Sequence, residues 1–286
     1  GGVGVVDLDT KEEDFITHLL DTSTHSDLLF FTDQGKAYKI KMFEIPEGKR
    51  ATRGKSIMNF ISLSEGEKVS SILAVPKDKK AQADLSLMMI TREGVGKKVA
   101  AKSFHDVRRS GLIAISLNEG DELISASFVS KGDDVLIVTK DAQSIRFAED
   151  DVREMGRNAA GVRVIRLDEK SKDKVISADV IKKGAKDSAL FVMSKNGYGK
   201  KTDIEEYKVQ NRGGSGILTG KVTDKTGELI AARVVTPEEE EVVAMSKKSQ
   251  VIRVDIKEIP ALGRQTQGVR IMKLRDGDSL ASLICL

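Results

Sequence analysis

The chain of 286 residues has no tryptophan, one cysteine, three histidines and four prolines. Aromatic residues make up 4% of it, so few side chains are present on which unpaired bases could stack. The single cysteine, Cys285, excludes an internal disulfide framework and fits a reducing compartment. No apolar run approaches the ~20 residues that span a bilayer, and residues 1–10 do not resemble a secretion signal. We therefore expect no membrane partner and a cytoplasmic location.

The residue patterns that carry enzyme chemistry are also scarce. His18, His25 and His105 are scattered, without a cysteine or paired carboxylate at ligand spacing, so we predict no metal site. Gly94–Lys98 and Gly197–Lys201 resemble a phosphate loop only in part, because the full glycine spacing and the final Ser or Thr are missing. No serine lies in a strand–turn–helix nucleophile context, and no pair of carboxylates is identifiable as an acid and a base. The sequence favours a module with no catalytic residues and no cofactor.

What the chain does have is an internal repeat of about 50 residues. Each copy begins with a short apolar strand, followed by Ser or Thr, a three-residue turn and, four positions after the turn, a cation. The recurring cations are Lys39, Lys98, Arg146, Lys201 and Arg253. Recurrence at one position of a repeat suggests that these cations share one place on the assembled fold.

A second signature is Arg-x-x-x-Gly followed by a β-rich run. It occurs at Arg50/Gly54, Arg157/Gly161, Arg212/Gly216 and Arg264/Gly268, and in a displaced form at Arg108-Arg109-Ser110-Gly111. Gly4 extends the glycine series to six members. We expect each glycine to permit a positive φ or a close approach of two chains. The arginine ahead of it either contacts phosphate or caps a loop, and the sequence leaves both roles open.

Repeats of this length built from short strands are typical of propeller blades. The first strands are predicted at Leu28–Phe31, Leu87–Ile90, Val135–Val138, Leu190–Met193 and Val242–Met245. A second strand follows each turn, a third follows each glycine (57–63, 113–117, 162–167, 217–222, 269–274), and a fourth completes the unit in most copies. The prediction is one all-β domain over residues 1–286, with six four-stranded blades and a ring closed between the N-terminal and C-terminal strands. Residues 77–84 and 237–241 are predicted to be polar loops.

Charge is distributed unevenly within the repeat. The net charge is only +3, yet the segments that run from each turn to the strand after the glycine carry an excess of cations. These segments are 33–58, 92–117, 140–166, 195–216 and 247–274. We expect a basic rim that fits the phosphates of a bent duplex. The alternative is that individual cations only face solvent and protect sheet edges from pairing.

Several stretches together closely resemble the C-terminal DNA-wrapping domain of the bacterial DNA gyrase A protein, a β-pinwheel of six propeller-like blades. They include Glu12–Ile16, Ala51–Gly54, Gly120–Ile124, Asn196–Lys200 and Gly263–Val269. The similarity covers essentially the whole chain. The first residues, Gly1-Gly2-Val3-Gly4, resemble the end of the family's glycine-rich basic box, with Val3 where a cation is usual.

The resemblance implies that the domain itself neither cuts DNA nor hydrolyses ATP. It would bind double-stranded DNA as a monomer and bend it around its rim. The N-terminal part of gyrase A and the gyrase B protein would supply the gate tyrosine and the ATPase. Together they would form a type IIA topoisomerase that introduces negative supercoils, located with the bacterial nucleoid.

The residues predicted to contact DNA are the recurring cations together with those around the glycines. The complete set is Lys39, Lys98, Arg146, Lys201, Arg253, Arg50, Arg53, Lys55, Arg108, Arg109, Arg157, Arg212 and Arg264, with Gly1, Gly2 and Gly4 as the residual glycine box.

Three alternatives remain open at this point. The equivalent C-terminal domain of topoisomerase IV, which favours unlinking over supercoiling, is similar to the same residues. A propeller that binds only proteins would use the same repeats without a nucleic-acid partner. A hydrolase on a propeller scaffold would need converging carboxylates or histidines, which the sequence does not indicate.

Overall fold

The computed structural model describes residues 26–41 and 61–286. Several residues singled out above therefore lie outside the described part of the chain. They are Gly1, Gly2, Gly4, His18, His25, Arg50, Arg53, Gly54 and Lys55.

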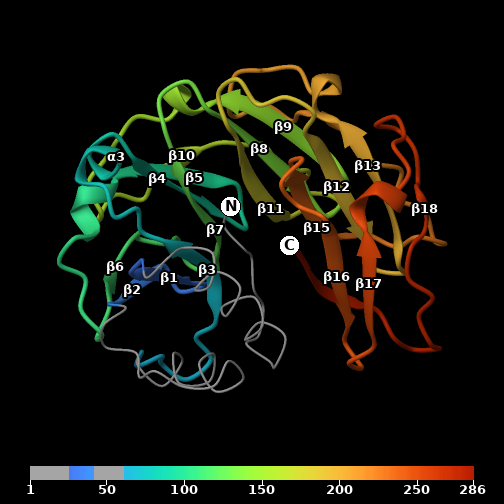
Figure 1. Cartoon of the computed structure of the whole chain (residues 1–286), viewed down its shortest axis with the longest axis horizontal. Helices are drawn as coiled ribbons and strands as arrows, with labels where there is room; N and C mark the ends of the chain where they lie inside the picture. The colour runs from blue at the N-terminus through green and yellow to red at the C-terminus, as the bar shows by residue number, and fades with distance from the viewer. Residues whose placement is uncertain (1–25, 42–60) are drawn as a thin grey trace. The chain divides into compact units, whose positions relative to one another are not determined.

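The regular secondary structure of the described chain consists mainly of antiparallel strands, which form five sheets (Figure 1). The first sheet has the order β3 (Val69–Ala74), β1 (Leu28–Thr32), β2 (Lys36–Ile40), β6 (Leu112–Ile113). The second has the order β10 (Val162–Arg163), β5 (Val95–Ala100), β4 (Ser86–Thr91), β7 (Leu123–Val129). The third has the order β11 (Val175–Ile181), β8 (Asp134–Thr139), β9 (Gln143–Ala148), β14 (Ile217–Leu218). The fourth has the order β15 (Leu229–Val235), β12 (Ala189–Ser194), β13 (Tyr198–Asp203), β18 (Val269–Arg270). The fifth has three strands, β17 (Val251–Asp255), β16 (Glu241–Ser246) and β19 (Leu280–Cys285).

The predicted first strands are confirmed, and each is longer than predicted by a residue at one or both ends. They are central in their sheets and almost fully buried, as the burial of all five residues of β1 illustrates. Continuous apolar runs suit strands that are covered on both faces. Short turns join them to the second strands, with pairs such as Leu29–Lys39 and Leu136–Arg146 directly opposite each other.

The sheet that receives the predicted third strand corrects the prediction. We expected all four strands of a blade to come from one repeat, but the strand after each glycine joins the sheet of the preceding repeat as its outer strand. Leu112 and Ile113 pair with Ala37 and Lys36 of the preceding repeat, and Ile217 and Leu218 pair with Ser144 and Gln143 in the same way. Neighbouring repeats within a sheet are therefore joined by strand exchange, which gives the fold its β-pinwheel character.

The exchanged strands are also shorter than predicted, with two residues in place of five or six. The reason is local. After Ile113 the chain leaves the ladder, because the N–H groups of Ala114 and Ile115 both bond to the carbonyl oxygen of Gly35 in the preceding turn, at 2.8 and 3.2 Å.

Five blades lie within the described residues, against the six predicted for the whole chain. The described residues form five sheets, and the fifth has no outer strand of the exchanged type among them. Residues 1–25, in which we expect the start of a sixth blade, lie outside the described residues. Of the strand predicted after Gly54, only residues 61–63 are described. The predicted ring closure depends on these segments and stays a prediction.

The role predicted for the recurring glycines is confirmed at four positions. Gly111, Gly161, Gly216 and Gly268 all have positive φ, between 76° and 93°. At Gly216 an added Cβ would also collide with the backbone carbonyl of Ser144. A side chain at this position is thus excluded by backbone conformation and by the approach of the neighbouring strand.

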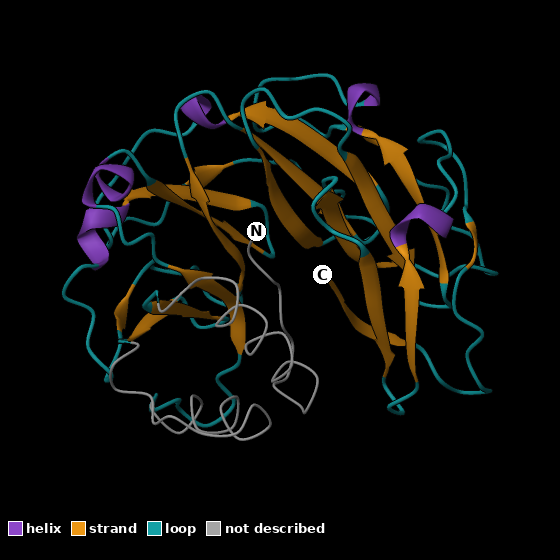
Figure 2. Cartoon of the chain, in the orientation of Figure 1, coloured by secondary structure: helices purple, strands orange, loops and turns teal. Residues whose placement is uncertain are grey.

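Short helices lie at the ends of strands (Figure 2). α3 (Lys79–Ala83) lies within the connection 77–84, which we predicted to be a loop, and begins at Asp78, whose carboxylate accepts a hydrogen bond from Lys80 N at 2.9 Å. The 3₁₀ helices are η2 (Ala101–Phe104), η3 (Glu149–Asp151), η4 (Ile204–Glu206) and η5 (Ile256–Glu258). Each follows the second strand of a repeat.

The chain divides into two compact units. The first contains the described residues up to Thr91, with Val95–Ser130 and Val152–Val162, and the second contains Arg92–Gly94, Lys131–Asp151 and Arg163–Leu286. Each unit has its own apolar clusters, for example around Phe31 and Phe104 in the first unit and around Met272 in the second. The prediction of a single domain stays a prediction. Among the described residues, no helix is both long and apolar enough to cross a membrane.

Candidate nucleic-acid interface

The five recurring cations occupy one register in their sheets. Each lies on the second strand of its repeat, opposite the same position of the first strand. The pairs are Lys39–Leu29, Lys98–Met88, Arg146–Leu136, Lys201–Phe191 and Arg253–Val243.

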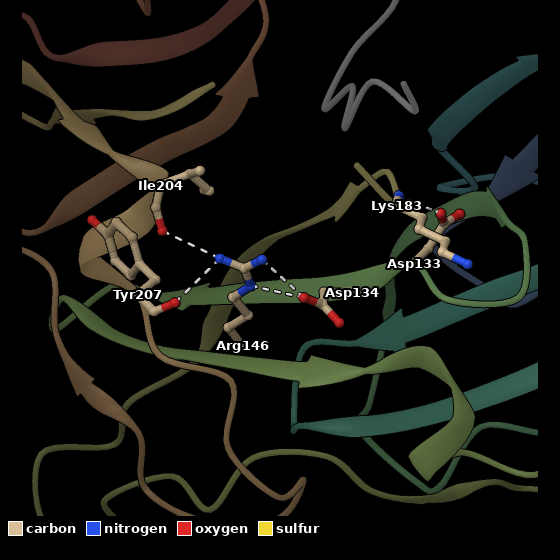
Figure 3. Close-up of polar contacts among 6 residues, drawn as sticks. All are labelled: Asp133, Asp134, Arg146, Lys183, Ile204 and Tyr207. Atoms are coloured by element: carbon tan, nitrogen blue, oxygen red, sulfur yellow. Dashed lines mark hydrogen bonds and ion pairs between the residues drawn. The ribbon is translucent and has the colours of Figure 1, made fainter. Parts of the chain in front are cut away.

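Arg146 shows what this position does within the protein (Figure 3). Its Nε and Nη2 atoms lie 2.9 Å from Oδ2 of Asp134, and its Nη1 donates to the carbonyl oxygens of Ile204 and Tyr207, both at 3.2 Å. Ile204 begins η4 and Tyr207 follows it. The guanidinium group therefore ties one repeat to the 3₁₀ helix of the next, and its side chain is only 16% exposed.

The same contact recurs elsewhere. Lys201 Nζ donates to the carbonyl oxygen of Ile256, the first residue of η5, at 3.0 Å. Lys39 Nζ donates to the carbonyl oxygen of His105, just after η2, at 3.3 Å. Lys98 is 7% exposed, whereas Arg253 has a 56% exposed side chain and pairs with Glu241 at 2.7 Å. Side-chain contacts between repeats thus engage Lys39, Arg146 and Lys201. DNA binding by this set of cations stays a prediction.

The arginines of the Arg-x-x-x-Gly signature also have partners within the protein. Arg157, Arg212 and Arg264 each donate from Nη1 to the carbonyl oxygen of the second residue in the preceding exchanged strand. The acceptors are Ile113 at 3.3 Å, Arg163 at 2.8 Å and Leu218 at 2.9 Å. The sequence left open whether these arginines contact phosphate or cap a loop. In the structure, the three guanidinium groups cap backbone carbonyls. These guanidinium groups connect successive glycine elements within each unit.

Sequence reasoning missed two lysines next to the predicted cations. Lys97 and Lys200 are 0% and 1% exposed. The ammonium group of Lys200 donates to the carbonyl oxygens of Gly263 and Arg264, both at 2.6 Å, and to Thr266 Oγ1 at 2.9 Å. Lys97 likewise donates to the carbonyl oxygens of Ala114, at 3.1 Å, and Arg157. The available signal was the Gly-x-Gly-Lys-Lys pattern, in which strand alternation must turn one of the two lysines inward.

Burial affects the protonation of both lysines. Desolvation, together with the positive charge of Arg157, lowers the pKa of Lys97 to about 8. Desolvation also lowers the pKa of Lys200 to about 8, where Glu206 opposes the shift and Arg264 adds to it. Each lysine keeps its hydrogen bonds to backbone carbonyls, so its main role is to shape the loop that carries the signature arginine of the next repeat.

Other cations on the glycine elements remain on the surface. Arg108 and Arg109 precede Gly111 and are exposed. In the second unit the exposed cations of the glycine elements are Arg163, Arg166, Arg212, Lys221, Arg270 and Lys273. Arg163 and Arg270 occupy the second position of their exchanged strands. Cations thus lie on the outermost strand of the second and fourth sheets, whereas the outer strands β6 and β14 are apolar.

The chemistry available at this surface is electrostatic. In the part of the chain that the structure describes, no three His, Cys, Asp or Glu side chains are grouped to hold a metal ion. Repeated guanidinium and ammonium groups on an edge strand suit a ligand with regularly spaced negative charges. Fold and surface together define a β-propeller-type protein with exposed cations on its glycine elements.

Comparison with known proteins identifies the family. The family model described as "DNA gyrase C-terminal domain, beta-propeller" matches residues 26–76, 86–130, 133–182, 189–236 and 240–286. The chain belongs to this family, which confirms the resemblance carried by its residues.

Similar proteins include the DNA gyrase A proteins of Staphylococcus epidermidis (strain ATCC 12228 / FDA PCI 1200) and of Staphylococcus aureus (strain NCTC 8325 / PS 47). Each is 40% identical over 283 residues, which is 99% of this chain and 31% of the relative. The chain thus spans about a third of the length of these relatives.

Two solved structures share the fold. One is described as the structure of the DNA gyrase A C-terminal domain, with a TM-score of 0.75 and 26% identity, covering 100% of this chain and 90% of that chain. The other is described as the crystal structure of the C-terminal domain of DNA topoisomerase IV, with a TM-score of 0.81 and 22% identity, covering 92% and 80%. At this identity the second likeness bears on the fold alone.

Proposed function

We propose that the chain is a non-catalytic module that binds duplex DNA and bends it along the outer strands of its sheets. The observation that carries the proposal is the recurrence of exposed cations on the glycine elements, two of them on exchanged strands, in a member of the gyrase C-terminal domain family. Phosphates follow one another along a duplex at regular spacing. A surface built from rotated repeats presents cations in the same manner.

Bending is costly, so several contacts must contribute. Curving 20–30 base pairs costs on the order of 1–6 kcal/mol. Contacts to the backbone carry little sequence information, so binding should be weakly selective and strongly dependent on salt.

Within the predicted set, the exposed residues are the favoured DNA contacts. These are Arg108, Arg109, Arg212 and Arg253, to which we add Arg163 and Arg270. The proposal gives Lys39, Arg146 and Lys201 a second role, because their cationic groups already stabilise contacts between repeats.

The proposal extends to the whole protein of which such a domain is a part. The relatives are gyrase A proteins, and we infer that this domain works with the N-terminal part of gyrase A and with gyrase B. Those parts would cleave DNA and hydrolyse ATP, while the wrap formed here would bias strand passage toward negative supercoils. A cytoplasmic, nucleoid-associated location belongs to the same proposal.

The test measures binding and bending together. A duplex of about 100 base pairs, shorter than the persistence length of about 150, carries a fluorophore at each end. We expect the 286-residue chain to bring the ends together and to lose affinity steeply with salt, with a log–log slope of about −0.9 per neutralised phosphate. Binding that is indifferent to salt, or that leaves the duplex straight, would contradict the proposal.

Matched variants connect the result to the surface. Replacing Arg163, Lys221 and Arg270 by glutamine should weaken binding, because these exposed cations lie on the glycine elements. Replacing the exposed Lys170, Lys186 and Lys247 by glutamine removes the same charge elsewhere and should have little effect.

Two other functions remain to be separated by experiment. A topoisomerase IV domain would share the fold, and topology assays on the complete A and B proteins, scored for supercoiling against unlinking, distinguish the two. A propeller that binds only proteins would show no mobility shift with duplex DNA at low salt.

A further inference from the structure

A cationic groove lies in the first unit, beside the connection between the first and second sheets. It consists of two adjoining hollows of about 680 and 520 Å³ that share Lys39 and His105. The first hollow is also lined by Lys77, Lys79 and Lys102. The second adds Lys41, Arg108 and Arg109, with Asp106 as its one acidic residue.

The groove is formed beside a helix that interrupts the connection between β3 and β4. Among the described residues, α3 is the sole α-helix, and it is inserted where the other repeats have short connections. The insertion contributes Lys77 and Lys79, and α3 packs beside η2, which contributes Lys102. Lys39 holds the backbone of His105 between the two hollows through the 3.3 Å hydrogen bond to its carbonyl oxygen.

Four cations of the groove are not balanced by an ion pair among the described residues, whereas Lys39 lies 4.0 Å from a carboxylate oxygen of Asp27. Lys77, Lys79, Lys102 and Arg108 are exposed and make no ion pair with any other residue that the structure describes. By contrast, Lys174 and Lys182 in the second unit pair with Glu93 and Asp133 at 2.6 and 3.2 Å. Like charges gathered in a concave surface focus a positive potential, which an anionic ligand would relieve.

We infer that this groove binds consecutive backbone phosphates of duplex DNA, as an anchoring site that extends from Lys39, one of the regular strand-borne cations, to cations outside that series. The inference rests on the proposed function. A backbone suits the site better than one small anion, because the cations are exposed and spread over two hollows. A single phosphate is usually enclosed by several directed donors, whereas a line of phosphates is held by dispersed charges.

The experiment compares two triple variants of equal charge. One carries Lys77→Gln, Lys79→Gln and Lys102→Gln, and the control carries Lys170→Gln, Lys186→Gln and Lys247→Gln, all at exposed positions. Affinity for a labelled duplex of about 30 base pairs is measured over a range of salt concentrations. The groove variant should bind about tenfold more weakly at low salt. The slope of its log association constant against log salt concentration should be shallower by about 2–3, because three cations near phosphates are lost. The control should stay close to the unmodified chain.

The outcomes separate this inference from the proposed function. If the unmodified chain does not bind duplex DNA, the proposed function fails and the inference with it. If it binds and both triple variants behave alike, the groove is not an anchoring site and only the inference is overturned. A further outcome would also overturn the inference. In it, inorganic tripolyphosphate binds the unmodified chain and not the groove variant, while the two triple variants bind DNA equally well. The ligand of the groove would then be a free polyphosphate.

Discussion

The ammonium group of Lys200 lies 2.6 Å from the backbone carbonyl oxygen of Arg264, at the start of the next Arg-x-x-x-Gly element. Arg264 in turn donates to the carbonyl oxygen of Leu218 on the exchanged strand before it. A buried lysine therefore shapes the loop, and the arginine of that loop connects it to its neighbour. The stability of the fold depends on these cations as well as on its apolar clusters.

The first prediction concerns this buried lysine. Lys200→Met should lower the free energy of unfolding by about 1–3 kcal/mol, because the carbonyl groups of Gly263 and Arg264 lose their donor. Urea denaturation followed by circular dichroism measures the change. Lys208→Met, at an exposed position of the same repeat, is the control and should stay within about 0.5 kcal/mol. Equal stability of the two variants would show that the contact is not needed.

The second prediction concerns pH. The pKa of Lys200 in the folded chain is about 8, below the ordinary 10.5, and that of Lys97 is also about 8. Between the folded and the ordinary pKa the unfolded chain binds protons that the folded chain does not, so the free energy of unfolding should rise with pH. From about pH 7.5 to about pH 9.5 we expect a gain of about 1–2 kcal/mol per lysine.

The variant Lys97→Met/Lys200→Met provides the reference for this prediction. It should lack the gain, while other titrating groups affect both proteins alike. The denaturation midpoints of the two proteins are compared over this pH range. If both midpoints change in parallel, the assigned pKa values are contradicted.

The third prediction concerns the exchanged strand. Gly216→Ala should destabilise the fold by about 2–4 kcal/mol, because φ is +76° and the new methyl group would meet the carbonyl of Ser144. Gly214→Ala in the same loop is the control, since Gly214 has no positive φ and its nearest atom would be 4.0 Å away. Thermal unfolding distinguishes them, and a stable Gly216→Ala protein would refute the close approach.

The fourth prediction is a stabilising change. The last residue of the turn before the second strand has positive φ in every described repeat, and it is glycine in three of them. Ser249 has φ of +68°, so Ser249→Gly should remove strain and raise the free energy of unfolding by about 0.5–1 kcal/mol. Ser249→Ala keeps the strain and should show no gain. A loss of stability in Ser249→Gly would mean that the serine side chain outweighs the strain.

Much of the fold was predictable because its signals are local. Runs such as Leu28–Thr32 are apolar almost throughout and are followed by turn residues, so the central strands could be located to within a residue or so. The glycine positions were predictable because few other residues adopt positive φ. The helix at Lys79–Ala83 was missed because five residues, none of them buried, carry no apolar periodicity.

The candidate site was predictable only in part. The repeat located Lys39, Arg146 and Lys201, but repetition alone does not reveal whether a cation faces solvent or a carbonyl oxygen. Arg146 and Lys201 bind backbone more than 50 residues away in the sequence, and Lys200 binds a loop 63 residues away. The cationic groove joins Lys77 to Arg108 through a helix that the pattern did not indicate.

The sequence by itself determined the period of the repeat, the positions of the buried strands and the places where only glycine fits, because these depend on neighbouring residues. The tertiary structure alone decided which sheet receives each two-residue strand, and that Lys200 is buried more deeply than Lys201. A strand of two residues carries too little pattern to specify its partner. Its place is fixed by backbone hydrogen bonds to another repeat, such as those from Ala114 and Ile115 to Gly35.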